Sequence, residues 1–270
     1  MAAPAPDISI WRNLDGEIVN SGVELALSTI LVEKGELSWD VGVNLAFIKN
    51  EVKNFGRIEE VGGLFGQGIT GATSQRFVNG QPLYAWYTRD FIEINGEGQS
   101  VYADNEALKY LGDPIPNTLL GIFTNFRYGG LSLNLAFNGA YGQTIYNNTL
   151  NTVLPIGNLG SRNIDASLGQ GTPLESTSNA IKASDRYIED ADYIKLNNAT
   201  LRYTFGDVGG LKGLSVSLTG QNLFVITDYS GFDPEINTVN ENANGVPSFG
   251  IEYTPYPTAR TFLLGIGFRF

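Results

Sequence analysis

Three stretches of the sequence carry side chains that could do chemistry. The first has oxygen-bearing side chains at the first, third, fifth and twelfth positions of a calcium loop, namely Glu93, Asn95, Glu97 and Asp104, with Gly98 at the sixth. Glutamate in place of aspartate lengthens the ligand arms and loosens the tight turn that such a loop needs. The stretch is therefore a weak calcium candidate, and a loop held by its glycines is the favoured interpretation.

The second stretch gathers carboxylates in front of a predicted strand: Asp185, Glu189, Asp190 and Asp192. A glycosidase needs two carboxyl groups that flank a sugar. This run lies where a long loop returns to a strand, so a solvated or salt-bridged loop base is the favoured interpretation. The chain has no histidine and no cysteine, which excludes imidazole bases, thiolate nucleophiles and the commonest zinc ligands. We expect no enzyme activity, no catalytic residue, no cofactor and no metal beyond the calcium candidate.

The third stretch runs from Tyr229 to Glu235 and reads YSGFDPE. Glycine supplies unusual backbone angles and proline fixes the backbone after the aspartate, so the pattern is typical of an ordered turn. Tyr229 and Phe232 could instead stack on a sugar or contact a partner protein, which makes them weak candidates for substrate binding. The turn chemistry alone explains the glycine and the proline, and it favours a structural role.

Charge and hydropathy exclude several other classes of protein. With 17 basic and 28 acidic residues the net charge is −11 and the pI is near 4.5, so a nucleic acid would be repelled. No run of about 18 apolar residues predicts a membrane-spanning helix. The first residues, MAAPAPDISIW, lack the basic start and apolar core of a secretory signal, so either the protein stays in the cytoplasm or its true N-terminus lies elsewhere.

The elements that must position these residues are strands. Apolar and polar side chains alternate with a period of two over most of the chain, and helical periods are scarce. The clearest patterns predict strands at 23–31, 37–47, 120–128, 131–141 and 214–218, with further strands at 82–94, 193–205 and 261–270. We expect the polar faces of these strands to carry Asn125, Arg127, Asn134, Asn138, Asn197 and Gln221.

The connections between the strands are of two kinds. Short connections lie at 32–36, 129–130 and 206–213, and long ones at 53–81, 95–117, 144–192 and 228–260. Transmembrane β-barrels have short turns at one end and long loops at the other. Strand direction then requires an even number of strands between those at 37–47 and 120–128. Because one pattern is evident there, we expect a second near 99–104 and about nine strands in all.

The last strand has a distinctive ending. Every second residue is apolar, and the chain stops on an aromatic ring; the five positions are Phe262, Leu264, Ile266, Phe268 and Phe270. This pattern is typical of the final strand of an outer-membrane barrel, whose apolar face meets lipid and which carries the signal for barrel assembly. A half-buried core strand would explain the alternation but not the terminal ring. Aromatic residues near the short turns, including Trp39, Tyr128 and Tyr203, would form an interfacial girdle.

Longer motifs resemble one family. The stretches YIEDADYIKLNNATLRYTFG (187–206), LKGLSVSLTGQNLFVITDYSGFDPEIN (211–237) and YPTARTFLLGIGFRF (256–270) resemble, in order and spacing, the C-terminal end of SusC/RagA-type TonB-dependent outer-membrane transporters. The resemblance extends from about residue 18 to the end. It implies a barrel of about 22 strands around an N-terminal plug. It also implies import of oligosaccharides or peptides beneath a SusD-like lipoprotein, with energy from the TonB complex.

Against that family the chain looks like a C-terminal part. We expect residues 1–17 to be a loop remnant and residues 18–270 to be the C-terminal portion of an antiparallel up-and-down transmembrane β-barrel, an open curved sheet with unpaired edges at 23–31 and 262–270. The expected partners are the missing plug and strands of the same transporter, a SusD-like lipoprotein, the TonB complex through the plug, and the outer-membrane bilayer. The alternative is a soluble lectin-like sandwich, which would bury the leucine-rich faces between two sheets.

Overall fold

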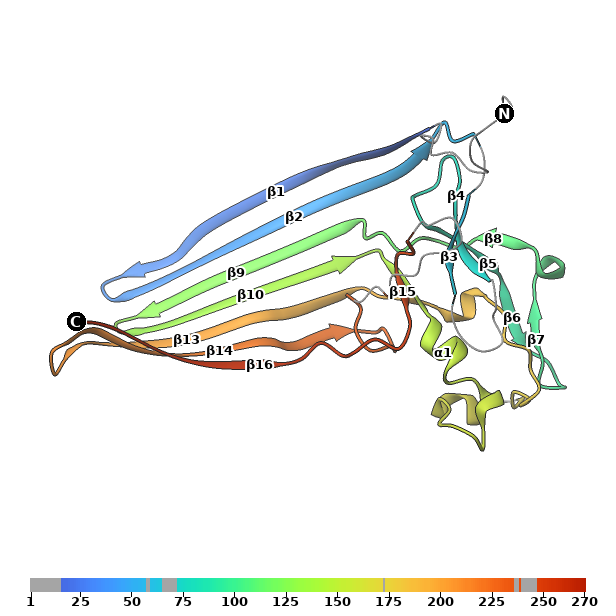
Figure 1. The fold of residues 1–270 in the computed structure, drawn as a ribbon. Helices are drawn as coiled ribbons and strands as arrows, with labels where there is room; N and C mark the ends of the chain where they lie inside the picture. Colours follow the sequence, from blue (N-terminus) through green and yellow to red (C-terminus); the bar gives the residue numbers. More distant parts are fainter. Residues whose placement is uncertain (1–15, 57–58, 65–71, 172, 236–237, 239–246) are drawn as a thin grey trace, which may run out of the picture.

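The computed structural model describes residues 16–56, 59–64, 72–171, 173–235, 238 and 247–270, so most of the expected loop remnant lies outside it. An antiparallel sheet of seven strands runs through the molecule in the order β1-β2-β9-β10-β13-β14-β16 (Figure 1). The all-β prediction is confirmed. The bounds of these strands are β1 Glu17–Lys34, β2 Leu37–Lys53, β9 Thr118–Tyr128, β10 Leu131–Tyr141, β13 Tyr193–Val208, β14 Leu211–Thr227 and β16 Thr261–Arg269.

The two ends of the sheet differ in their connections, as the sequence predicts. At one end, tight turns at 35–36, 129–130 and 209–210 join neighbouring strands. Gly129 and Gly209 have φ angles of 55° and 57°, which glycine adopts without strain. At the other end, the three excursions between β2 and β9, β10 and β13, and β14 and β16 gather into a folded unit that we call the cap (Figure 1).

The number of strands in the large sheet is seven rather than about nine. The segments at 82–94 and 99–104 fold into the cap, because β2 pairs directly with β9 along its length. Because neighbouring strands alternate in direction, an even number of strands must lie between β2 and β9. That number is zero, which meets the requirement as well as two would. The cap strands in this excursion are β3 Glu59–Gly63, β4 Thr73–Phe77, β5 Ala85–Arg89, β6 Phe91–Ile94, β7 Ser100–Tyr102 and β8 Leu108–Tyr110.

The cap holds the main hydrophobic core of the described residues. A four-stranded sheet (β3-β4-β5-β8), a hairpin (β6-β7) and a three-stranded sheet (β12-β11-β15) surround Trp86, Tyr146 and Ile251, which are at most 2% exposed. No helix in the described ranges is long and apolar enough to cross a membrane. The remaining cap elements are β11 Thr144–Asn147, α1 Asn148–Thr152, β12 Ile188–Asp190, β15 Ile251–Glu252, and 3-10 helices at Asp104–Glu106, Ile156–Asn158, Ala166–Gly169 and Asp185–Tyr187.

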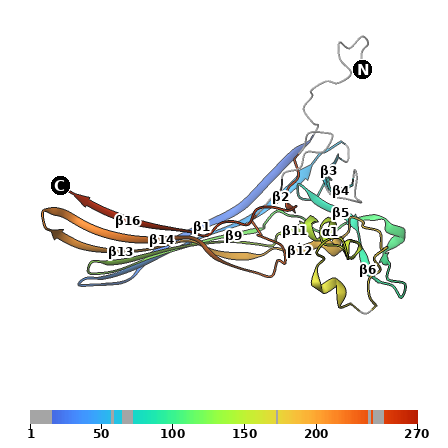
Figure 2. The ribbon, with the colours of Figure 1, turned by 60° about the horizontal axis from the view of Figure 1, so that its bottom comes forward.

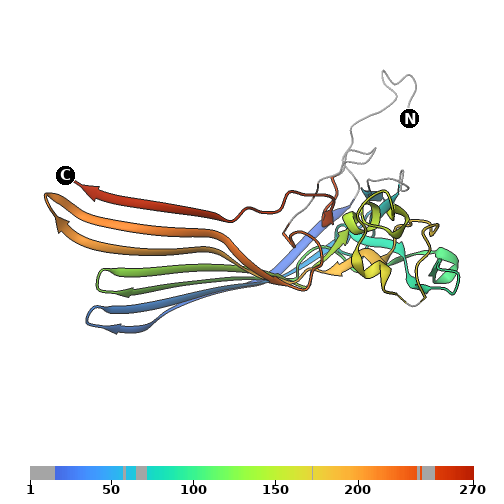
Figure 3. The ribbon, with the colours of Figure 1, turned by 90° about the horizontal axis from the view of Figure 1, so that it is seen from below.

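One face of the large sheet is apolar across every strand. The register places seven side chains side by side, one from each strand in turn: Val32, Trp39, Phe126, Leu133, Leu201, Leu218 and Leu264. A β-bulge between Ile30 and Val32 brings Val32 into this row in place of Leu31. Leu218 is 50% exposed and Leu264 is 73% exposed, and the strands run beyond the cap as a single layer (Figures 2 and 3). A sandwich would bury this row under a second sheet, which the described residues do not form.

The opposite face is mostly polar. Asp40, Asn125, Asn134, Thr200 and Thr219 lie side by side on five neighbouring strands. The amide of Asn125 donates to the Asp40 carboxylate at 2.6 Å, and the hydroxyls of Thr200 and Thr219 lie 2.9 Å apart. The register also places Arg127, Asn138 and Gln221 on this face, whereas Asn197 lies in a β-bulge between Leu196 and Asn198.

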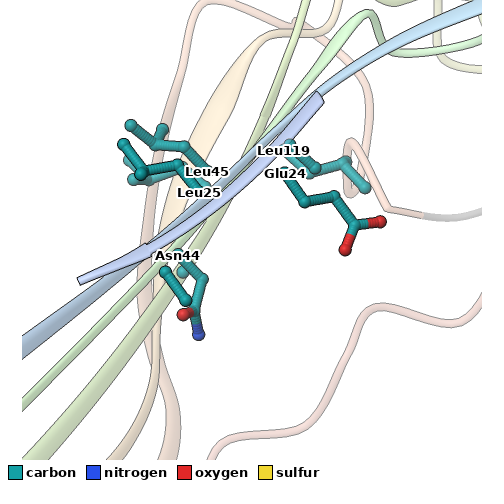
Figure 4. Close-up of a pocket in the computed structure, with 9 residues that line it drawn as sticks. Glu24, Leu25, Asn44, Leu45 and Leu119 are labelled. Carbon is teal, nitrogen blue, oxygen red and sulfur yellow. The ribbon is translucent and has the colours of Figure 1, made fainter. Parts of the chain in front are cut away.

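The hollow drawn in Figure 4 illustrates the alternation and is not an enclosed cavity. It crosses β1, β2 and β9, and its lining side chains point to both sides of the sheet. Leu25 and Leu45 lie on the apolar side, while Glu24, Asn44 and Leu119 lie on the other (Figure 4). Among the described residues β1 pairs only with β2 and β16 only with β14, so the sheet is open and has the two free edges that the sequence predicts.

Candidate functional site

The candidate site lies where the cap meets the polar face of the sheet, and it is built around the turn Tyr229–Glu235. Two cap carboxylates hold the first half of this turn. Glu252 accepts hydrogen bonds from the Tyr229 hydroxyl and the Phe232 amide, both at 2.8 Å. Glu189 accepts from the amide and the hydroxyl of Ser230, both at 2.9 Å. The turn is therefore fixed to β15 and β12 by four hydrogen bonds to charged acceptors.

The two aromatic residues of the turn occupy different environments. Tyr229 is 6% exposed and packs against Ile145 and Ala191, and burial followed by the nearby Glu252 raises the pKa of its phenol far above the ordinary value. Its hydroxyl therefore stays a hydrogen-bond donor. Phe232 is 53% exposed, so its ring is available at the surface while its backbone amide is held. As a substrate-binding prediction, Phe232 retains a free ring face and Tyr229 does not.

The second half of the turn lies against the polar face of the sheet. Glu235 accepts hydrogen bonds from the Tyr193 hydroxyl and the Asn138 amide, both at 2.8 Å, and pairs with the ammonium group of Lys195. The Lys195 ammonium also lies 3.9 Å from the carboxylate of Asp233. Lys195 and Asp233 are each 6% exposed. We call these five residues the Lys195 clamp, because they fasten the turn to β10 and β13.

The protonation of Glu235 should control the clamp. Burial favours the neutral acid, but hydrogen bonds from Lys195, Asn138 and Tyr193 outweigh it and hold the pKa of Glu235 below its ordinary value of 4.5. A lowered pKa in the folded state gives a stabilisation that is complete above about pH 4.5 and is lost as the pH falls through the folded value. We expect lower protection factors, relative to intrinsic exchange at the same pH, for the amides of residues 229–235 below pH 4.5, and protection factors that depend much less on pH in Glu235→Gln.

Two of the four residues of the calcium candidate, Asn95 and Asp104, have other partners for their side chains. Asn95 lies in the turn between β6 and β7, where its side-chain oxygen accepts from the amides of Glu97 at 3.0 Å and Gln99 at 2.9 Å. Asp104 pairs with Lys109 at 2.8 Å. No group of three or more acidic residues in the described ranges is placed to hold a metal ion. The calcium site stays a prediction from spacing.

The carboxylates before β13 hold loops of the cap in place by accepting hydrogen bonds from backbone amides. Asp185 accepts from the Phe91 amide at 2.7 Å, Asp190 from the Asp192 amide at 2.8 Å, and Asp192 from the Gly142 amide at 2.6 Å. Together with Glu189, these carboxylates bind backbone donors of the cap. The favoured interpretation of the run as a structural loop base agrees with these contacts.

Sequence reasoning missed Lys195 and the partners that bury it. One signal was available: Lys195 is the only charged residue between Tyr193 and Leu201, at a position whose side chain points to one defined face. A lysine there must either reach water or meet an acid. The acid, Glu235, comes from the far end of the turn motif, and only the fold brings the two together.

Four residues of the C-terminal pattern share one exposed face of β16, and the fifth, Phe270, directly follows the strand. Their exposed fractions run from 46% for Phe268 to 93% for Phe270. Ring pairs lie at the short-turn end, with centroids 4.8 Å apart for Tyr203 and Phe205 and 5.3 Å apart for Phe268 and Phe270. The indole N–H of Trp39 is satisfied by the Thr124 hydroxyl at 2.8 Å. An exposed apolar face whose polar atoms are satisfied internally suits a lipid environment.

Comparison with known proteins identifies the relatives of the chain, although no protein-family model matches it. It is 25% identical over 299 residues to TonB-dependent receptor P3 of Formosa agariphila and 23% identical over 285 residues to TonB-dependent receptor SusC of Bacteroides thetaiotaomicron. Each match covers 94% of this chain, which spans 29% and 27% of the two relatives.

A solved structure, that of the RagAB peptide transporter, has the same fold. It superimposes with a TM-score of 0.77 at 19% identity, over 94% of this chain and 29% of that one. The RagAB peptide importer in its open-open state gives a TM-score of 0.72. The relatives are named as receptors and transporters, in agreement with the expectation that the chain is not an enzyme. The chain is thus related in sequence to the SusC/RagA-type TonB-dependent receptors and has the fold of part of such a transporter.

Proposed function

We propose that the chain is the C-terminal portion of the barrel wall of an outer-membrane TonB-dependent transporter, formed by residues 18–270. The observation that carries the proposal is the apolar row across all seven strands, which faces outward from a single-layered sheet whose other face is polar. A barrel wall needs lipid on one side and a wet lumen on the other. The two free edges, β1 and β16, are where the remaining strands of the barrel would pair.

We also propose a cargo and partners for the complete transporter. The complete transporter would import oligosaccharides or peptides with a SusD-like lipoprotein over the cap, and a plug outside this chain would contact the TonB complex. Support comes from the sequence motifs and from the fold shared with the RagAB peptide transporter. Cells that lack the gene should lose uptake of one labelled oligosaccharide or peptide class. Unchanged uptake of every such class would contradict the import role.

We also propose that the alternating C-terminal residues act as the barrel-assembly signal. The exposed rings of Phe268 and Phe270 lie on the apolar face at the end of an edge strand, where a folding factor could pair with it. Removing Phe270 should lower the amount of folded, heat-modifiable receptor in the outer membrane. Phe249→Ser, an exposed ring in the cap, is the control. Equal amounts of receptor after removal of Phe270 would contradict the assignment.

The absence of cysteine from the chain allows a direct test of membrane topology. Ala180→Cys places a thiol on an exposed position of the cap, and Glu36→Cys places one in a turn at the opposite end. If the sheet is a barrel wall with the cap outside, a membrane-impermeant maleimide should label the first variant in intact cells. It should label the second only after the outer membrane is permeabilised. Equal labelling of both in intact cells would contradict the orientation.

A further inference from the structure

One aromatic ring lies at the centre of the mostly polar face of the large sheet. Phe123 is the middle residue of β9, and it is 39% exposed. Its neighbours in register are Gly42 of β2 on one side and Ala136 of β10 on the other, and Ser28 of β1 follows Gly42 in the same row. These neighbours are small, so the row has room for a ligand above the ring.

The ring of Phe123 lies flat across the backbone of β2. A methyl group on the Cα atom of Gly42 would be 1.9 Å from Cζ of the ring and 2.4 Å from each Cε atom. These three distances place the methyl position beneath Cζ, along the normal to the ring, so one face of the ring rests on Gly42. Gly42 is buried and Phe123 is exposed, so the other face of the ring is open toward the polar side of the sheet. A ring that only filled a core would be covered on both faces.

Polar side chains surround the ring at four corners. The corners are the diagonal neighbours of Phe123 on β2 and β10, whose Cα atoms lie about 7–8 Å from its own. They are Asp40 and Asn44 on β2, and Asn134 and Asn138 on β10. We call Phe123 and these four residues the Phe123 platform. The hollow of Figure 4 adjoins the platform, because Asn44 belongs to both.

The asparagines at the corners can make further hydrogen bonds. Within the described ranges, the side chains of Asn44 and Asn134 make no hydrogen bond, and each carries N–H donors and a carbonyl acceptor. The Asn138 amide donates to Glu235, but its carbonyl oxygen is buried and has no partner among the described residues. The platform therefore combines an apolar centre with a rim that both donates and accepts hydrogen bonds.

A sugar ring has the shape and the chemistry that this platform fits. Its faces carry C–H groups, which suit the negative face of an aromatic ring, and its rim carries hydroxyls, which both donate and accept. A peptide has its polar groups along one line, so it would not place donors and acceptors on all sides of one ring. Asp40 is the one charged member of the platform, in a chain whose net charge is −11, and this disfavours an anionic ligand.

We propose that the Phe123 platform binds one neutral sugar unit of an oligosaccharide cargo, which stacks on Phe123 while its hydroxyls bind the asparagines at the corners. The inference rests on the proposed function, which makes the polar face the wall of the lumen, and it selects oligosaccharides over peptides as the cargo. Gly42 is a positioning residue of this site, because its lack of a side chain lets the ring lie flat.

A tryptophan reporter in the complete receptor tests the proposal. Phe123→Trp places an indole on the platform, and the control, Phe47→Trp, places one on the apolar face of β2. The probes are a pool of neutral hexasaccharides from partly hydrolysed plant and algal polysaccharides, and a pool of random hexapeptides. We expect the hexasaccharides to shift the emission of Phe123→Trp saturably and to leave that of Phe47→Trp unchanged. No shift with hexasaccharides, an equal or larger shift with hexapeptides, or an indole at position 123 that acrylamide cannot quench before any probe is added would overturn the proposal.

A second set of variants separates stacking from folding. For the hexasaccharide fraction that shifts the emission, Phe123→Ala should weaken binding to the folded, heat-modifiable receptor by about tenfold or more, whereas Phe123→Tyr, which keeps the ring, should stay within about twofold. Gly42→Ala should lift the ring and weaken binding although Phe123 is unchanged. Equal affinities of Phe123→Ala and Phe123→Tyr would overturn the proposal. The thiol labelling of Ala180→Cys and Glu36→Cys separates this failure from failure of the proposed function.

Discussion

Replacing Lys195 with methionine should release the turn Tyr229–Glu235 from the sheet and cost about 3–5 kcal/mol of unfolding free energy. The ammonium group is the positive partner of two carboxylates, Glu235 and Asp233, in a site where its side chain is 7% exposed. Methionine fills a similar volume but leaves the buried carboxylate of Asp233 and the partly exposed carboxylate of Glu235 without their counter-ion. Guanidinium titration of the receptor in micelles measures the loss, and hydrogen exchange of residues 229–235 locates it.

Lys49 provides a matched control for this prediction. Its ammonium group lies 3.1 Å from the Glu51 carboxylate, but its side chain is 73% exposed, so Lys49→Met should change the free energy of unfolding by about 0–1 kcal/mol. Adding Glu235→Gln to Lys195→Met should recover part of the loss, because it removes one of the stranded charges. Similar losses for Lys195→Met and Lys49→Met, or no recovery in the double variant, would show that the buried pairing does not hold the turn.

The strands of the large sheet could be predicted because their signal is local. β10 keeps one apolar and one polar face over its full length, β9 does so except at Leu119 and Phe123, and the turn between the two strands is a pair of glycines. In a single-layered wall every alternate side chain meets the same solvent, so the period of two is kept except at the β-bulges. The same simplicity explains why the C-terminal strand could be placed to within a residue of its bounds.

The cap could not be predicted because its order depends on contacts between distant segments. Tyr146 of β11 pairs in parallel with Ile251 of β15, and Trp86 packs between elements that lie far apart in the chain. Strands of two to five residues leave too few positions for a period to appear. The candidate site also depends on contacts between distant segments, because Glu189 and Glu252 hold one turn from two different strands. Neither their spacing nor their residue type relates these glutamates to Ser230 or Tyr229 in the sequence.

Arginine placed on the apolar face at the middle of β10 should be far more costly than arginine on the polar face beside it. Leu135 lies between Leu133 and Phe137 on the face that we assign to lipid, and Asn134 lies on the opposite face. At the bilayer midplane a charged side chain costs about 2–4 kcal/mol, so Leu135→Arg should lose that much unfolding free energy in lipid. Asn134→Arg should stay within about 0.5 kcal/mol of the unaltered receptor.

The depth of the substitution separates a membrane wall from a buried core. Leu131 has the same facing as Leu135 but adjoins the turn at 129–130, so Leu131→Arg should cost only about 0–1 kcal/mol near the interface. A core strand in a soluble protein would penalise a buried arginine according to packing, with no gradient toward the turn. A loss of unfolding free energy that is larger for Leu135→Arg than for Leu131→Arg would thus show that the apolar row lies in hydrocarbon. Equal losses at the two positions, or a larger loss at Asn134, would mean that the apolar row does not face lipid.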